Sequence, residues 1–392
     1  MLVGIVGSPN KGKSTMFSAL TMIDVHIADY PFTTIKPNVG TTYITKECVH
    51  NSLSVKCTPR NSECVGGVRR IPVEIIDVAG LVAGAHEGRG MGNQFLGDIS
   101  SADALILVAD GSGHTDSSGN PCQGCNPVED VRVVVDEISE WLAGIITKHM
   151  GAISRSKNAA EALVGILTGM RIGMADIEHC ISECNLTSSN ANWNENDVRK
   201  FSKALLKRAK PFMIAANKSD IPGFYNKVKL LYKEFGEERV VPCSAAVELA
   251  LRKAERQGII EYNGNPEQIR IIKKEITHAQ EYAINYMVGF AREHGTGVQQ
   301  IINKIYFDIL DNIVVYPVED EGKYTDHFGN VLPDAILIKR GSTALDLAAK
   351  IHTDLGERML YAVDARTKKR LAKGYVLNDN DVIKVVSAAK PK

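Results

Sequence analysis

The first residues that could do chemistry form a glycine-rich segment close to the N-terminus. Residues 7–15 read G-S-P-N-K-G-K-S-T, which has the spacing G-x-x-x-x-G-K-[ST]. An apolar run, 2–6, precedes them and a helical pattern follows. The backbone N–H groups of such a loop bind phosphate oxygens, its lysine neutralises phosphate charge, and its serine hydroxyl binds Mg²⁺. We therefore predict Lys13 as a catalytic residue, Ser14 as a magnesium ligand, and these nucleotide contacts: Ser8, Pro9, Asn10, Lys11, Gly12, Lys13, Ser14 and Thr15.

Two further segments have side chains that could complete a magnesium and phosphate site. Thr33 and Thr34 lie in a proline-containing stretch after the first helical pattern. A hydroxyl there could bind Mg²⁺ and sense the γ-phosphate, although a plain surface loop has the same composition. We predict Thr34 as a metal ligand and catalytic residue. The second segment is a D-x-x-G motif at a strand end, in which Asp77 would hold Mg²⁺ through water and the Gly80 N–H would contact the γ-phosphate.

The base that the nucleotide carries is indicated by two motifs that also follow strand patterns. Residues 217–220 read N-K-S-D after the apolar run 211–216, and S-A-A follows the run 240–242. The Asp220 carboxylate can accept hydrogen bonds from N1–H and from the N2 amine of guanine, and adenine lacks this pair of donors. The S-A-A backbone can donate to guanine O6. The predicted base contacts are Asn217, Lys218, Asp220, Ser244, Ala245 and Ala246.

The elements that must position these motifs are strands followed by loops. Apolar runs at 2–6, 39–45, 73–78, 105–110, 211–216 and 240–242 predict strands, and the intervening patterns predict helices. We predict an α/β fold with a mostly parallel sheet and helices on both faces, formed by residues 1–127 and 207–310. Residues 128–206 contain only helical patterns and predict an inserted helical subdomain. Residues 311–392 contain short strands and one helical pattern, which predicts a small β-rich domain.

Composition limits the classes of function. The chain has 392 residues, 44% of them hydrophobic, and a formal net charge of zero. A nucleic-acid partner would therefore need a local basic patch, and residues 366–373 contain five lysines and arginines, which are also common on plain surfaces. No apolar run reaches the ~18 residues of a membrane span, and no signal-peptide pattern is present. We expect a cytoplasmic protein that does not bind membranes and acts as a monomer.

Four of the eight cysteines lie in two polar loops. Cys57 and Cys64 flank a turn-like stretch, and Cys122 and Cys125 form a C-x-x-C pair. If the two loops meet, the four thiolates could bind Zn²⁺ tetrahedrally. Redox activity of Cys122 and Cys125, or free thiols throughout, are the alternatives.

Taken together, the motifs resemble those of the Obg-type GTPases. The order P-N-x-G-K-S-T, Y-P-F-T-T, D-V-A-G-L-V, N-K-x-D and S-A-A is similar to theirs, and the glycine-rich residues 80–96 match the YchF-like branch most closely. The C-terminal segment, with D-H-F-G-N at 326–330 and G-S-T at 341–343, resembles a TGS domain with a β-grasp-like fold. The helical insertion also fits YchF-like proteins. The resemblance covers nearly the whole chain.

This resemblance implies a P-loop GTPase that hydrolyses GTP to GDP with Mg²⁺ and contacts ribosomes or RNA through its TGS and helical domains. Bacterial and eukaryotic YchF-like proteins have a degenerate base motif and are associated with ATP. Because N-K-S-D is intact here, we predict GTP. The alternative is a GTP-sensing or ATP-accepting module with negligible turnover, which could respond to redox state or metal as a stress regulator.

The expected rate of hydrolysis is low, because Leu81 stands where Ras-like enzymes have the glutamine that orients water. His86 could replace that glutamine, since a histidine titrates near neutral pH and the surrounding glycines suit a loop that closes; it could also be an ordinary surface residue. Arg89 is a second candidate for stabilising charge. Asn10 offers another route, because asparagine at this position in some related GTPases helps to hold K⁺.

Overall fold

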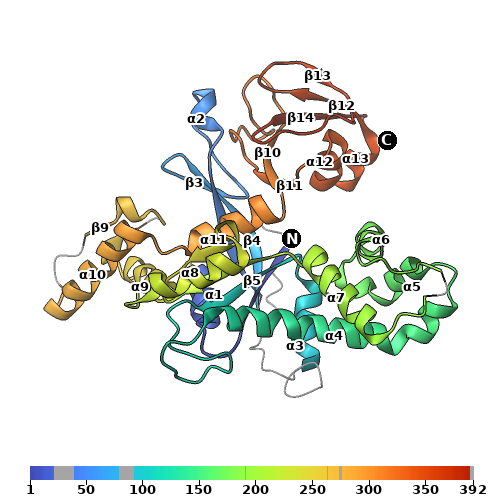
Figure 1. Ribbon diagram of the computed structural model, residues 1–392. Coiled ribbons are helices and arrows are strands. Elements are labelled where there is room, and N and C mark those ends of the chain that lie inside the picture. The colour runs from blue at the N-terminus through green and yellow to red at the C-terminus, as the bar shows by residue number, and fades with distance from the viewer. Residues whose placement is uncertain (22–38, 79–91, 190, 263, 273–275, 389–392) are drawn as a thin grey trace. The chain divides into compact units, whose positions relative to one another are not determined.

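The computed structural model describes residues 1–21, 39–78, 92–189, 191–262, 264–272 and 276–388 (Figure 1). The described residues fall into two compact units. Residues 1–21, 39–41 and 74–301 form the first unit, and residues 42–73 and 302–388 form the second. Residues 42–73, which the strand pattern grouped with the N-terminal domain, thus pack with the C-terminal segment.

A largely parallel sheet contains the strands of residues 1–242. Its strands follow the order β2-β4-β1-β5-β6-β7, with β3 pairing antiparallel to β4. Parallel pairing joins β1 to β4 and β5, and joins β6 to β5 and β7. The bounds are β1 Leu2–Val6, β2 Val39–Glu47, β3 Glu63–Val65, β4 Val68–Asp77, β5 Ala104–Asp110, β6 Phe212–Asn217 and β7 Val240–Pro242. Because ligands bind outside the carboxyl ends of parallel strands, this topology collects the predicted motifs at one edge.

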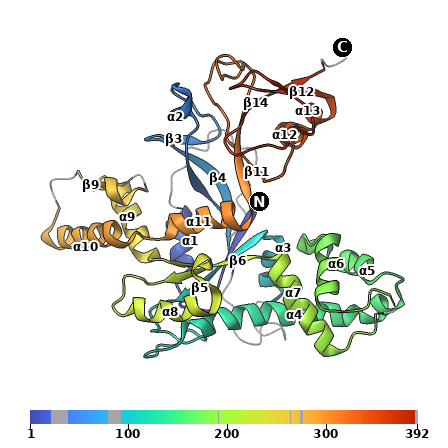
Figure 2. The same ribbon diagram turned by 45° about the horizontal axis from the view of Figure 1, so that its top comes forward.

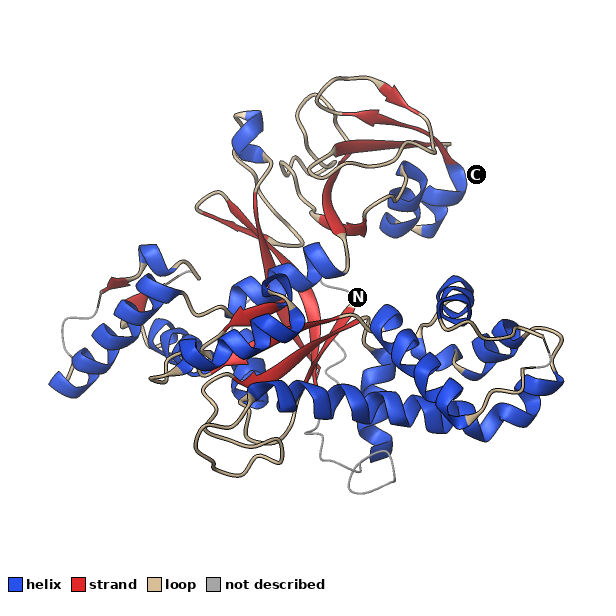
Figure 3. Ribbon diagram, viewed as in Figure 1, coloured by secondary structure: helices blue, strands red, loops and turns tan. Residues whose placement is uncertain are grey.

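Helices cover this sheet, as Figure 3 shows. Strand β5 is buried along its whole length, as expected for a strand covered on both faces. The helices of this unit outside the insertion are α1 Lys13–Thr21, α3 Gly92–Ser101, α8 Phe224–Phe235, α9 Ala245–Arg256, α10 His278–His294 and α11 Val298–Lys304. A two-stranded ribbon, β8 Ile260–Glu261 with β9 Arg270–Ile271, accompanies them. The predicted α/β fold is confirmed.

The inserted segment consists of helices that share a core of their own. They are α4 Pro127–Arg155, α5 Ala159–Ile166, α6 Met174–Glu183 and α7 Glu195–Ala209, and they lie together in both views (Figures 1 and 2). Asn194 caps α7 with a capping box, and Asn126 caps α4. Helix α4 contributes Val131 and Ile138 to the core under the sheet, and contributes Ile146 and Ile153 to the core of the insertion. One continuous helix therefore belongs to both cores.

The second unit contains a mixed five-stranded sheet of order β11-β10-β14-β12-β13. Strands β10 and β14 are parallel, and the outer pairs are antiparallel, which is a β-grasp-like arrangement. Thr343 caps α12 with a capping box. The bounds are β10 Asn312–Val318, β11 Ile336–Lys339, α12 Ala344–Ile351, α13 Thr353–Arg358, β12 Met359–Asp364, β13 Arg370–Leu371 and β14 Val382–Ser387, with the short α2, His50–Leu53, in the N-terminal part.

In the part of the chain that the structure describes, no helix combines the length and the apolar character needed to cross a membrane.

Candidate functional site

The glycine-rich loop connects β1 to α1 and is held closely by its neighbours. Gly12 has a φ of +91°, and a Cβ there would collide with Nδ2 of Asn217, so only glycine fits. The Lys13 ammonium donates to the Ser8 carbonyl at 2.8 Å, across the turn of the loop. Burial lowers the pKa of Lys13, although the Asp77 carboxylate opposes this shift. The Ser8 hydroxyl is buried and has no hydrogen-bond partner among the described residues. The Lys13 ammonium thus donates to a neutral carbonyl, and the Ser8 hydroxyl has no acceptor among the described residues, so both groups could bind a negatively charged phosphate.

Ser14 and Asp77 come from distant parts of the sequence and meet beside this loop. The Ser14 hydroxyl donates to Asp77 Oδ2 at 3.3 Å. Burial raises the pKa of Asp77, against the hydrogen bond from Ser14 and the charge of Lys13. A hydroxyl and a carboxylate offer oxygen atoms of the kind that Mg²⁺ binds, directly or through water. Their proximity is compatible with the predicted roles, in which Ser14 is a magnesium ligand and Asp77 holds the ion through water.

The two base-recognition motifs also meet, at the ends of β6 and β7. Asp220 Oδ1 accepts a hydrogen bond from the Ser244 hydroxyl at 2.6 Å. The Asn217 side chain donates to the Lys11 carbonyl at 2.9 Å and accepts from the Ala245 N–H at 3.0 Å. Because the Ala245 N–H is engaged, Ala246 is the better donor for a base; it is exposed and lies in the first turn of α9, where N–H groups lack intrahelical acceptors.

Lys11 binds protein groups with its side chain and leaves only its backbone for a nucleotide. Its ammonium is fully buried and forms an ion pair with Asp130 Oδ1 at 2.8 Å. It also donates to Thr115 Oγ1 at 2.9 Å and to the Asp116 carbonyl at 2.7 Å. Burial raises the pKa of Asp130, and the Lys11 ammonium opposes that shift. The phosphate loop is thereby tied to the loop that follows β5 and to the first turn of α4.

A second buried carboxylate, Asp110, organises the loop after β5. Its Oδ2 accepts from Thr115 Oγ1 at 2.6 Å and from the Lys218 ammonium at 2.7 Å, and its Oδ1 accepts from the Ser112 N–H at 3.0 Å. Burial alone would raise the pKa of Asp110, but the hydrogen bonds from Lys218, Ser112 and Thr115 outweigh it and lower the pKa. Lys218 thus ties the base-recognition loop to the loop after β5.

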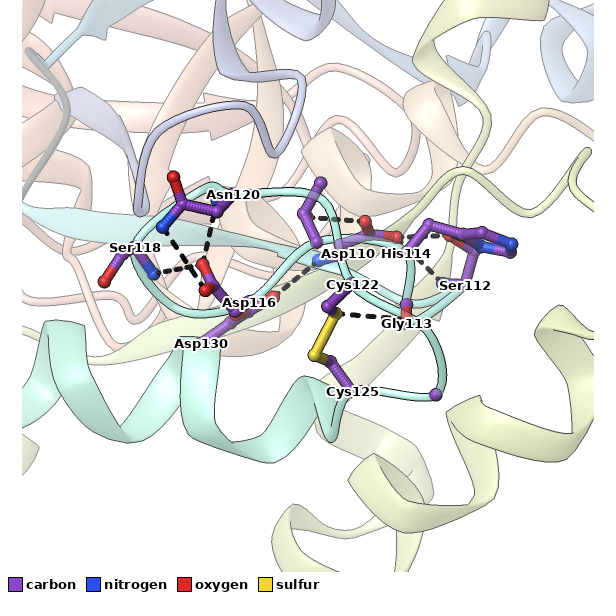
Figure 4. Close-up of a disulfide and its surroundings, with 12 residues drawn as sticks. Asp110, Ser112, Gly113, His114, Asp116, Ser118, Asn120, Cys122, Cys125 and Asp130 are labelled. Carbon is purple, nitrogen blue, oxygen red and sulfur yellow. Dashed lines mark hydrogen bonds between the residues drawn. A yellow bond between two sulfur atoms is a disulfide. The ribbon is translucent and has the colours of Figure 1, made fainter.

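The rest of this loop is closed by local contacts (Figure 4). Asp116 Oδ1 accepts from the N–H groups of Ser118 and Asn120 at 3.0 and 2.8 Å. Gly119 presents its carbonyl to Asn10 Nδ2 at 2.9 Å, so the amide nitrogen of Asn10 is used within the protein.

Of the alternatives that the sequence left open for these cysteines, the four-cysteine zinc site is wrong. Cys122 and Cys125 form a disulfide, which removes both thiolates from metal binding (Figure 4). Cys57 lies next to Cys48 and His50 instead.

Several residues that the sequence singles out lie outside the described residues. They are Thr33, Thr34, Gly80, Leu81, His86 and Arg89.

Sequence reasoning missed several side chains that matter here. Asp110 and Asp130 were overlooked, although an acidic residue at the end of a buried strand and one in the next helix are a detectable signal. Cys48 and His50 form a C-x-H pair directly after β2, which also could have been noticed.

Comparisons with known proteins agree with this geometry. Residues 2–150 match the family model described as a 50S ribosome-binding GTPase. Residues 215–320 match an Obg-like GTPase YGR210-like, G4 motif-containing domain, and residues 328–387 match a TGS domain. A GTP-binding protein of Methanocaldococcus jannaschii is 51% identical over 99% of this chain and 100% of its own. The ribosome-binding ATPase YchF of Mycoplasma pneumoniae is 31% identical over 55% of this chain and 56% of its own. The crystal structure of a GTP-binding protein from Pyrococcus horikoshii has a TM-score of 0.79 and 36% identity, covering 99% of this chain and 100% of its own.

The pairing of Ser14 with Asp77 predicts how Asp77→Asn behaves. In the presence of a chelator, the variant should bind nucleotide as tightly as the wild-type protein does. The factor by which Mg²⁺ increases nucleotide affinity should be about tenfold or more smaller in the variant, because the carboxylate charge is gone. Nucleotide titrations with and without Mg²⁺ measure both. Glu74→Gln is the matched control, since position 74 of β4 alternates to the opposite face. An unchanged magnesium effect in Asp77→Asn would refute the role of Asp77.

The buried pair of Lys11 and Asp130 predicts a large effect of Asp130→Asn. Leaving the ammonium without its counter-charge should destabilise the protein by about 3–5 kcal/mol and weaken nucleotide binding, because Lys11 belongs to the phosphate loop. Glu129→Gln is the control: its pair with Arg132 is exposed and screened by solvent, so its loss should leave the stability almost unchanged. Denaturant unfolding and nucleotide titration measure the two effects. Equal stability of both variants would contradict this assignment.

Proposed function

Because the chain belongs to the Obg-like GTPase family, in the YchF-type branch with a C-terminal TGS domain, we propose that it is a guanine-nucleotide switch. It binds GTP with Mg²⁺, hydrolyses it slowly to GDP and phosphate, and acts on the ribosome in the cytoplasm. Lys13 and Ser14 bind the phosphates and the magnesium ion, and Asp220 selects the base.

The observation that carries this proposal is the meeting of Asp220 with Ser244 at 2.6 Å, beside the Asn217 amide that joins both loops. An acceptor pair on Asp220 with a backbone donor at Ala246 matches the N1–H, N2 amine and O6 of guanine. Adenine would leave the Asp220 acceptors unpaired, which costs a site built to hydrogen-bond two donors much of its affinity. We therefore favour GTP, although the Mycoplasma relative carries the name ATPase.

Slow turnover follows from the residue after the D-x-x-G motif. Leu81 has no group that can orient the attacking water, so the site needs help from elsewhere. Thr34 and His86 are our candidates within the chain, with Lys13 neutralising charge on the phosphates. A K⁺ ion held beside Asn10 would supply a further positive charge, and equal turnover in K⁺ and Na⁺ would remove that possibility.

The ribosome is proposed as the target for two reasons. The model that residues 2–150 match is described as a ribosome-binding GTPase, and the Mycoplasma YchF relative is named ribosome-binding. The TGS domain also has a basic turn between β12 and β13. Residues 366–373, which span this turn and β13, carry five exposed cations, and Arg370 stacks on Tyr361 with its guanidinium 3.8 Å from the ring centroid. Such a turn suits phosphate contacts.

Base selection by Asp220 predicts a change of specificity in Asp220→Asn. Its amide can no longer accept from both guanine donors, but it can donate to the C2 carbonyl of xanthine. GTP affinity should fall about 100-fold or more, and XTP affinity should rise. Competition titrations with GTP, XTP and ATP measure this, and ATP affinity serves as the internal control. Tighter ATP than GTP binding by the wild-type protein would overturn the guanine assignment.

Action on the ribosome predicts nucleotide-dependent co-sedimentation. The protein with a non-hydrolysable GTP analogue should pellet with ribosomes more than with GDP, because only the triphosphate state orders a switch. Lys369→Glu/Lys373→Glu should reduce pelleting, and Lys253→Glu on α9 serves as the control. Single-turnover hydrolysis with and without ribosomes completes the test. Absence of both pelleting and stimulated hydrolysis would favour a sensor with negligible turnover.

A further inference from the structure

Four potential metal ligands of the second unit lie together, apart from the nucleotide site's residues. Cys48, His50, Cys57 and Cys64 place their ligand atoms within 4.8 Å of one another. Cys57 Sγ is 3.9 Å from Cys48 Sγ and 3.2 Å from His50 Nδ1, and Cys64 Sγ is 3.6 Å from the same nitrogen. All three cysteines are free thiols.

These separations match the edges of a tetrahedron around zinc. With Zn–S of about 2.3 Å and Zn–N of about 2.05 Å, ligands of a regular tetrahedron lie about 3.8 Å apart for two sulfurs and about 3.6 Å apart for sulfur and nitrogen. A disulfide would instead bring two sulfurs to about 2.05 Å. Three thiolates and one imidazole are a ligand set that zinc commonly takes in structural sites.

The backbone builds this cluster from three local turns. Cys48 follows β2, and its N–H donates to the Gly67 carbonyl at 2.8 Å. His50 begins the short helix α2. Cys64 lies in β3, which returns to β4 through the two-residue turn Gly66–Gly67, where φ is +58° and +83°. Positive φ at both positions is the signature of a tight hairpin turn, which fixes Cys64 opposite the turn after β2.

A buried positive charge beside the cluster is an independent indication of a negative partner. Arg69 pairs with Cys64 across the hairpin and is fully buried. Its Nη2 donates to the Leu332 carbonyl at 2.8 Å, but Nε and Nη1 have no hydrogen-bond partner among the described residues. The nearby Asp334 is paired with Arg60 at 3.7 Å. The Arg69 guanidinium also lies over the Tyr316 ring, 5.7 Å from its centroid, but a buried cation that lacks a full counter-charge is still costly. Zinc with three thiolates and a neutral imidazole bears one negative charge, which balances Arg69.

We infer that Cys48, His50, Cys57 and Cys64 bind one structural zinc ion. Four protein ligands complete the tetrahedron, so no position stays open for a substrate, and the role is structural. The ion holds the segment that reaches the C-terminal part of the same unit. Thr58 N–H donates to the Val331 carbonyl at 2.9 Å, and the Arg60 N–H donates to the Pro333 carbonyl at 2.7 Å.

The test is the metal content of the full-length protein, purified under reducing conditions without added chelator. Elemental analysis should find about one zinc per chain, as a closed four-ligand site binds one ion. Cys57→Ser and Cys64→Ser should lose most of it. Cys122→Ser/Cys125→Ser is the matched control with the other two loop cysteines, and should keep it.

A second measurement avoids variants that fail to fold. Wild-type protein stripped of zinc and given Co²⁺ should show the visible bands of tetrahedral cobalt and thiolate-to-cobalt charge transfer, and Zn²⁺ should displace them. Four outcomes would each overturn the inference: zinc-free wild-type protein that takes up neither ion, zinc retained in Cys57→Ser and Cys64→Ser, iron in place of zinc, or a disulfide within the cluster in the reduced preparation.

Discussion

The assembly of the nucleotide site depends on one carboxamide, that of Asn217. Its nitrogen donates to the Lys11 carbonyl in the phosphate loop, and its oxygen accepts from the Ala245 N–H in the loop after β7. Because the amide is planar and nearly fully buried, the two loops keep one separation, and a donor and an acceptor are satisfied together. The absence of a side chain at Gly12 is part of the same constraint, since Asn217 occupies the space that a Cβ would need.

The charged side chains around this amide pair with one another and hold the loops in place, so other groups must bind the nucleotide. Lys11 and Asp130 neutralise each other inside the protein, and Asp110 does the same for the Lys218 ammonium. Such pairs contribute little net stability compared with apolar residues, but they allow few alternative arrangements, because each charge needs its own partner. The ammonium of Lys13, whose pKa is lowered by burial, donates to the neutral Ser8 carbonyl and could bind a charged phosphate more strongly.

Local patterns predicted much of this structure and little of its buried polar chemistry. The apolar runs predicted most strands of the two larger sheets, because an apolar run depends on residues close in sequence. The motifs likewise pointed to Ser14, Asp77 and Asp220. Asp130 could have been noticed in the helix after β5, but its pairing with Lys11 joins positions far apart in the chain, and lysines in such loops are usually exposed, so the spacing does not reveal the partner. The possible grouping of Cys57 and Cys64 with Cys122 and Cys125 failed because composition says which thiols exist but not which loops meet.

Helix α4 connects the nucleotide site to the inserted helices. Its first turns hold Asp130 against Lys11, and its last turns lie in the separate core of the inserted helices. With 29 residues it is a stiff rod about 43 Å long, so a tilt of about 5° at the phosphate loop would move the far end by about 4 Å. A small rearrangement beside a phosphate would thus become a larger displacement of the inserted helices, with α4 acting as a lever arm.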